Sequence, residues 1–115
     1  MISKVRLRER FLEEPLSVRL GELAVTFSRV STCARMAMIS STTNALKEAR
    51  YMIEWTAAET EPEIAAELVS MQRLVTLWIK VWEKANQTKD QRTLLSVQAK
   101  HWSDRALDFS GLISQ

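Results

Sequence analysis

Apolar residues recur at alternating steps of four and three along three long stretches of the chain. The first series is Leu16, Leu20, Leu23, Phe27, Val30, Ala34 and Ala37. The second is Ile64, Leu68, Met71, Val75, Trp78, Trp82 and Ala85, and the third is Leu95, Ala99, Trp102, Ala106, Phe109 and Ile113. Because an α-helix turns once every 3.6 residues, this spacing places each series on one side of a helix. The pattern therefore predicts three long amphipathic helices.

A fourth, shorter series runs through Leu46, Ala49, Ile53 and Thr56, out of step with the first. Residues 40–44, Ser-Ser-Thr-Thr-Asn, lie between the two series. Their side chains hydrogen-bond to the nearby backbone and compete with helix formation. They therefore favour a turn over the alternative, one continuous helix whose apolar stripe changes position around the axis at this point. With two Gly and two Pro in 115 residues, the chain has little turn chemistry for hairpins. We expect an all-α fold.

Cap signals mark the other helix boundaries. Pro15, the Thr60–Glu63 sequence TEPE and the Thr88–Gln91 sequence TKDQ are typical helix starts. The predicted helices therefore span residues 15–40, 44–58, 61–86 and 89–111. Since the connections are short, successive helices must run antiparallel, which predicts an up-down-up-down four-helix bundle over residues 15–115.

Residues 1–14 form a separate basic segment. Lys4, Arg6, Arg8 and Arg10 alternate with other residues, a period of two that indicates an extended arm. Helix formers are also frequent there, so a short helix that ends at Pro15 is an equal alternative. The sequence leaves this choice open.

Charge and cysteine content exclude several classes of protein. The formal net charge is +2, although residues 51–72 carry five Glu and no Lys or Arg. The longest uncharged stretch, residues 36–46, is much shorter than the ~20 apolar residues of a membrane span. Residues 1–10 lack the apolar core of a secretory signal, and the single Cys33 has no disulfide partner. We expect a cytoplasmic protein without a membrane span.

Candidate catalytic and metal-binding groups are few. The chain has one histidine, no Glu-x-x-His sequence and no carboxylate on the inward series, which excludes a di-metal site of the ferritin type. His101 with Asp104 three residues later could transfer protons, and Glu59, Glu63 and Glu67 are spaced by four. An exposed histidine and helix-start carboxylates explain these residues more simply. We therefore expect no enzyme activity, no cofactor and no metal.

The first long helix is apolar on two sides. Val18, Val25 and Ile39 lie about 200° from its main series, and Gly21, Ala24, Ser28 and Ser31 add a flank of small residues. A bundle covers one stripe per helix, so the far side needs another partner. We expect a homodimer built partly on this helix and residues 1–14. The expected contact residues are Val18, Val25, Ile39 and Trp55, with Arg6, Arg8 and Arg10 as an electrostatic guide.

The sequence therefore predicts an adaptor, scaffold or regulatory subunit that acts through protein–protein contacts. Two alternatives remain open. The basic N-terminal segment could bind nucleic acid, with a strong dependence on salt. Small inward residues (Ala34, Ala37, Ala99 and Ala106) could leave a small-molecule pocket opposite Trp78, Trp82 and Trp102. Leu74, Leu77 and Val81 are assigned to the core, because they widen the apolar stripe of Trp78 and Trp82.

Overall fold

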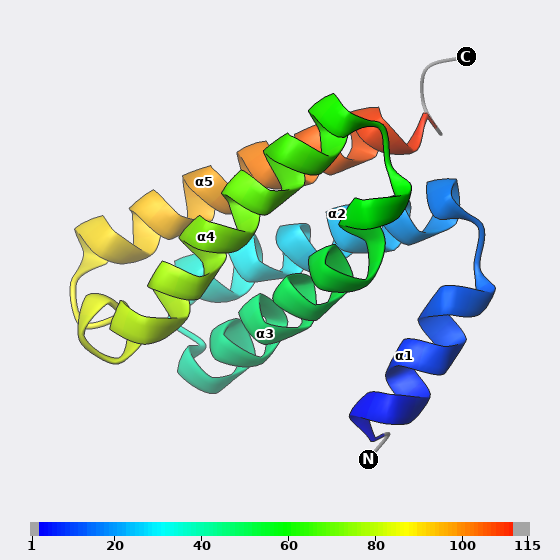
Figure 1. The fold of residues 1–115 in the computed structure, drawn as a ribbon. Coiled ribbons are helices and arrows are strands. Elements are labelled where there is room, and N and C mark those ends of the chain that lie inside the picture. The colour runs from blue at the N-terminus through cyan, green and yellow to red at the C-terminus, as the bar shows by residue number, and fades with distance from the viewer. Residues whose placement is uncertain (1–2, 112–115) are drawn as a thin grey trace.

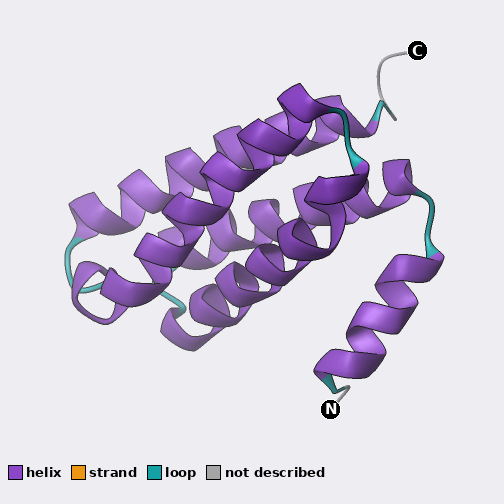
Figure 2. Cartoon of the chain, in the orientation of Figure 1, coloured by secondary structure: helices purple, strands orange, loops and turns teal. Residues whose placement is uncertain are grey.

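The computed structural model describes residues 3–111, and that part of the chain is built from helices and short loops (Figures 1 and 2). The elements are α1 (Lys4–Glu13), α2 (Leu16–Arg35), α3 (Ile39–Thr56), the 3-10 turn η1 (Ala57–Glu59), α4 (Pro62–Ala85) and α5 (Lys89–Ser110). The prediction of an all-α fold is confirmed. The described residues form five α-helices, because the basic N-terminal segment is itself helical, and its alternative as an extended arm is wrong.

The four long helices alternate in direction. Ser31 of α2 lies against Ser96 of α5, whereas Ala24 lies against Ser103, so these two helices run antiparallel. The long helix α2 packs against α3 and α5, and α4 packs against the same two helices (Figure 1). Helices α2 and α4 are therefore diagonal to each other, and their outer faces point to opposite sides of the molecule.

The predicted apolar series meet in the core between these helices. Leu23, Phe27 and Val30 of α2 are fully buried, and the Phe27 ring lies 5.3 Å from that of Trp102. The inward position predicted for Ala37 is wrong, because this residue is exposed in the loop after α2. Ile113, the last member of the third series, lies outside the described residues.

Small side chains bring α2 and α5 into close contact. The Ser103 hydroxyl donates a 2.7 Å hydrogen bond to the backbone carbonyl of Ala24, and the Ser31 hydroxyl donates a 2.8 Å bond to that of Ser96. A serine can reach a carbonyl on the neighbouring helix only where the two backbones approach closely. This contact covers Ala24 and Ser31 of the small flank on α2, whereas Ser28 is exposed and Gly21 is only partly buried.

The break between the first two long helices lies at residues 36–38, earlier than predicted. Ala37 adopts a left-handed backbone conformation with φ of 56°, and α3 begins at Ile39. The serines and threonines of residues 40–43 instead lie inside α3. The Thr42 hydroxyl donates a 2.7 Å bond to the Met38 carbonyl and the Thr43 hydroxyl a 3.2 Å bond to that of Ile39, so these polar groups are satisfied within the helix.

The two predicted capping boxes have different outcomes. Thr88 caps α5, because its hydroxyl accepts a hydrogen bond of 3.3 Å from the Gln91 amide. The prediction for Thr60 is wrong, since its hydroxyl donates to the Ala57 carbonyl at 2.7 Å and closes η1. Helix α4 then begins at Pro62, whose lack of an N–H costs nothing in a first turn.

The first helix, α1, stands to one side of the other four and contacts α3 (Figure 1). Phe11 is the one buried residue of α1, and its ring lies 5.9 Å from that of Trp55 on α3. The ammonium of Lys4 lies 4.1 Å from the centre of the Tyr51 ring, also on α3. The guanidinium of Arg19 on α2 also lies 6.0 Å from the centre of the Phe11 ring, so one aromatic contact and two cation–π contacts attach α1 to α2 and α3.

Candidate functional site

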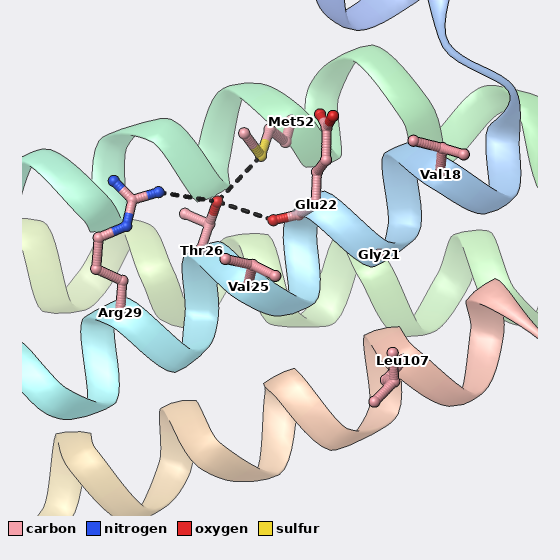
Figure 3. Close-up of a pocket in the computed structure, with 8 residues that line it drawn as sticks. All are labelled: Val18, Gly21, Glu22, Val25, Thr26, Arg29, Met52 and Leu107. Atoms are coloured by element: carbon pink, nitrogen blue, oxygen red, sulfur yellow. Dashed lines mark hydrogen bonds between the residues drawn. The ribbon is translucent and has the colours of Figure 1, made fainter. Parts of the chain in front are cut away.

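A surface hollow with a volume of about 530 Å³ lies along the outer face of α2. Figure 3 shows its lining, in which α2 supplies most of the residues, α3 supplies one and α5 supplies one. We name this hollow the α2 groove, and it is lined by Val18, Gly21, Glu22, Val25, Thr26, Arg29, Met52 and Leu107.

The floor of the α2 groove is apolar and open to solvent. Val25 is 65% exposed and Val18 is half-buried, and both lie on the outer face of α2. Between them Gly21 has no side chain, which hollows the helix surface and lets another backbone or side chain come close. Neither α1 nor α5 covers this face, so the structure leaves the second apolar side of α2 uncovered within the described residues.

The rim of the α2 groove carries an uncompensated acidic group. Burial raises the pKa of the Glu22 carboxyl above its ordinary value, and the nearby Glu14 carboxylate raises it further. Arg29, the cation of the groove, is engaged elsewhere, because one of its guanidinium nitrogens lies 3.1 Å from a carboxylate oxygen of Glu48. Within residues 3–111, no basic side chain forms an ion pair with Glu22.

A second hollow of about 290 Å³ continues from the α2 groove toward α1. The two hollows share Glu22 and Met52, and the second adds Leu7, Arg10, Phe11 and Glu14. Helix α1 thus forms the far wall of a continuous surface that is apolar at its base and carries two carboxylates and the Arg10 cation at its middle.

Two of the predicted contact residues lie away from this groove. Ile39 is exposed, but it begins α3 and is no part of the outer face of α2. Trp55 is half-buried rather than exposed, because it packs against Phe11 and stacks on Tyr51 with 5.7 Å between the ring centres. The structure therefore brings together Val18 and Val25 and separates them from the other two.

The three arginines of the N-terminal segment do not share one face. A step of two residues turns a helix by about 200°, so Arg6 and Arg10 lie on one side of α1 and Arg8 lies nearly opposite. Their alternation would have aligned them along a strand. As a helix, α1 presents a scattered positive charge, and no arrangement of its arginines favours nucleic acid over a protein partner.

The structure also shows an apolar surface that the sequence interpretation missed. Four exposed side chains line the outer junction of α4 and α5, and we name them the α4 seam: Leu74, Leu77, Val81 and Leu94. They surround a hollow of about 310 Å³ with Trp78 in its lining. Below these exposed side chains Trp78 links α4 to α5, because its indole N–H donates a 2.6 Å bond to the Gln98 side chain.

The assignment of Leu74, Leu77 and Val81 to the core is therefore wrong. A signal for the α4 seam exists in the sequence, since a second series at steps of three and four lies beside the core series of α4. Its members are Glu67, Ser70, Leu74, Leu77, Val81 and Lys84. Two parallel seams on one helix indicate two partners, and one bundle supplies only one of them.

Basic side chains border the α4 seam along α4. Arg73, Lys80 and Lys84 lie within about 60° of Leu77 around the helix axis. No acidic side chain of the described residues forms an ion pair with any of these three cations. The rim of the α4 seam is therefore positive, whereas the rim of the α2 groove is negative.

The candidate catalytic groups are occupied by structural contacts. Lys100 donates a 2.8 Å bond to the Asp104 carboxylate, so Asp104 does not orient His101. Arg19 and Arg105 hold Glu59 and Glu67 through paired hydrogen bonds, and these bonds lower the pKa of both carboxyls. In residues 3–111, no three His, Cys, Asp or Glu side chains gather to hold a metal ion.

Three of the four small inward residues that could leave room for a small molecule lie inside the bundle. Ala34, Ala99 and Ala106 are fully buried in the apolar core. Ala37, the fourth residue of that set, is exposed outside the core. The α2 groove and the α4 seam lie on the outside of the molecule instead. None of the helices between residues 3 and 111 has the length and apolar composition needed to cross a bilayer.

The chain has two apolar surfaces whose rims carry opposite charges, and these are the features from which a function follows. Protein-family models, curated proteins and solved structures contain no match to the chain.

Proposed function

We propose that this chain is a non-enzymatic helical protein that acts through protein–protein contacts and associates with itself. In this proposal α2 to α5 form an up-down-up-down bundle that carries the contact surfaces, and α1 is an accessory helix. The α2 groove binds a helical segment of a partner, one that presents apolar side chains and a Lys or Arg beside them.

The exposed apolar floor of the α2 groove is the observation that carries the proposal. Complete burial of a valine is worth about 1.5 kcal/mol or more, and Val25 remains 65% exposed in the chain alone. Gly21 allows a partner helix to pack directly against the α2 backbone. A contact here would recover burial that the fold itself does not use.

The acidic rim determines the chemistry of the partner. Glu22 is partly desolvated and lies near Glu14, so a cation on the partner would relieve an unfavourable charge in the free protein. An acidic partner would add to the repulsion. A basic amphipathic helix is therefore the favoured occupant.

The absence of catalysis rests on how the ionisable groups are used. Glu59 and Glu67 are ion-paired to arginines, and Cys33 is buried in α2. A general base must be free of ion pairs and lie close to a substrate, and an activated thiol must lie in an exposed electropositive site. These groups contribute to the fold rather than to chemistry.

A peptide titration tests the proposal. The probe is an amphipathic helical peptide of leucine and lysine, compared with the same peptide in which glutamate replaces lysine. We expect the leucine–lysine peptide to shift the backbone amide resonances of Val18, Gly21 and Val25 in NMR spectra of the labelled protein. Val25→Lys should abolish these shifts, because a long cation fills the groove and neutralises Glu22.

The matched control is Val97→Lys, which places the same side chain at an equally exposed position on α5 (64% exposed) outside the groove. This variant should bind like the unmodified protein. Equal binding by the Val25→Lys variant, or a response to the peptide confined to other surfaces, would refute the α2 groove as the contact site.

A further inference from the structure

We propose that the partner helix bound by the α2 groove is the α4 seam of a second copy of this chain, in a head-to-tail arrangement. This inference rests on the proposed function and names the occupant of the groove. Leu77 and Val81 of one copy enter the α2 groove of the next, and a lysine of the seam's rim meets Glu22.

The apolar side chains of the two surfaces match in spacing. Val18, Gly21 and Val25 follow one another at steps of three and four, as do Leu74, Leu77 and Val81. Both sets therefore form one straight row along a helix. The α4 seam projects exposed side chains, whereas the α2 groove is hollowed at Gly21, so that a row of projections faces a row with a recess.

The charges of the two rims also match. Arg73, Lys80 and Lys84 are cations without an ion pair among the described residues, and they lie beside Leu77. Glu22 is a carboxylate without an ion pair there, and it lies beside Val25. Contact between the two surfaces brings opposite charges together over desolvated apolar area, where their attraction is less screened than in water.

A symmetric dimer in which the paired helices run antiparallel has the wrong charge pattern on either surface. A two-fold axis perpendicular to α4 at the centre of the α4 seam would place the basic edge of one copy against the basic edge of the other. A two-fold axis at Gly21 of the α2 groove would bring the two Glu22 carboxylates together. Like charges at an interface cost free energy, so the head-to-tail contact is favoured over both symmetric ones.

The fold places the two surfaces so that they do not interfere. Helices α2 and α4 are diagonal in the bundle, so that a copy bound at its α2 groove still presents a free α4 seam on its opposite side (Figure 1). The first product is a dimer with one free groove and one free seam. Further copies add in the same way, because a head-to-tail contact does not close unless its rotation forms a ring.

Two variants that each disable one surface provide the test. Val25→Lys fills the α2 groove. Leu77→Glu places a negative charge in the α4 seam, at a side chain that is 54% exposed and that the fold does not need buried. Mass is measured by light scattering or sedimentation from about 10 μM to 1 mM, since small interfaces are weak.

The unmodified chain should grow from monomer to dimer and larger species as its concentration rises. Each variant alone should associate at least about tenfold more weakly. An equimolar mixture should form a dimer and nothing larger, because the groove of the Leu77→Glu chain and the seam of the Val25→Lys chain remain intact. Only a head-to-tail contact predicts that two defective chains restore a dimer.

Controls separate this result from damage to the fold. Val97→Glu introduces the same charge at an exposed position of α5, away from the basic edge of the α4 seam, and should associate normally, as should Val97→Lys. Circular dichroism must show unchanged thermal unfolding, and Leu77→Ser replaces Leu77→Glu if the latter unfolds.

Three results would overturn the inference. The first is a mixture of the two variants that remains monomeric, and the second is association that survives either variant. The third is an unmodified chain that stays monomeric over the whole concentration range. If that chain still binds the leucine–lysine peptide at the α2 groove, the groove stands as a protein-contact surface, whereas self-association and the identity of the partner are wrong.

Discussion

Truncation of Phe11 should release α1 while the remaining helices stay folded. Phe11 is 3% exposed and is the one buried residue of α1, and its ring packs against Trp55 at 5.9 Å. Phe11→Ala removes this anchor. An isolated helix of ten residues is marginal in water, so α1 should unfold once it detaches.

The size of the effect follows from the lost contacts. Burial of a phenylalanine is worth about 1.5 to 3 kcal/mol, and an aromatic pair adds about 0.5 to 1.5 kcal/mol. The lower sum, about 2 kcal/mol, corresponds to a roughly 30-fold increase in the opening of α1. Because the loss is local, the free energy of unfolding of α2 to α5 should change by much less.

Amide hydrogen exchange measures this difference directly. In the Phe11→Ala variant, protection of residues 4–13 should fall at least about 30-fold, and the central amides of α2 and α5 should keep theirs. Val5→Ala is the control, because Val5 is exposed on the same helix. An equal loss of protection in α1, α2 and α5 would refute the reasoning, since α1 would then unfold together with the whole core.

Three further predictions concern the core and the ionisable groups. Ser103→Ala should lower the free energy of unfolding in urea by about 1 kcal/mol, because it removes the hydrogen bond to Ala24. Ser103→Val should cost about 1 to 3 kcal/mol more, because the larger side chain forces α2 and α5 apart. Equal costs for the two variants would contradict the close packing of these helices. Arg105 lowers the folded-state pKa of Glu67, so this ion pair stabilises the fold above about pH 4.5, and its contribution is lost as the pH falls through the folded-state pKa. Glu67→Gln should therefore weaken the dependence of unfolding free energy on pH in this acid range. Burial raises the folded-state pKa of Glu22, so the charged carboxylate destabilises the fold at neutral pH. Glu22→Gln should raise the melting temperature at pH 7 and have no such effect below about pH 4. A lower melting temperature of this variant at pH 7 would contradict the destabilising role of the Glu22 charge.

The sequence predicts the helices and most of the core because the residues that become buried recur with the period of an α-helix. Leu20, Leu23, Phe27 and Val30 are buried where their spacing places them on one stripe. The position of the first turn could not be predicted in the same way. Its left-handed residue is Ala37, which carries no glycine or proline signal, and the polar residues that follow satisfy their hydroxyls inside α3.

The candidate site could be predicted only in part. The outer position of Val18 and Val25 follows from helical geometry on one helix, since no other element needs to be known. The α4 seam depends on how α4 is placed against α5, and the Trp78–Gln98 contact that links them is a tertiary feature. A broad apolar stripe alone does not show which of its edges a neighbour covers.

The close pairing of α2 with α5 has a consequence for synthesis on the ribosome. The Ala24 carbonyl can accept its hydrogen bond only after Ser103 is synthesised, which is 79 residues later in the chain. At roughly 5 to 20 residues per second, this interval lasts about 4 to 16 s. During that time the small-residue flank of α2 has no permanent neighbour, so the nascent chain must hold it in water or against a chaperone until the last helix emerges.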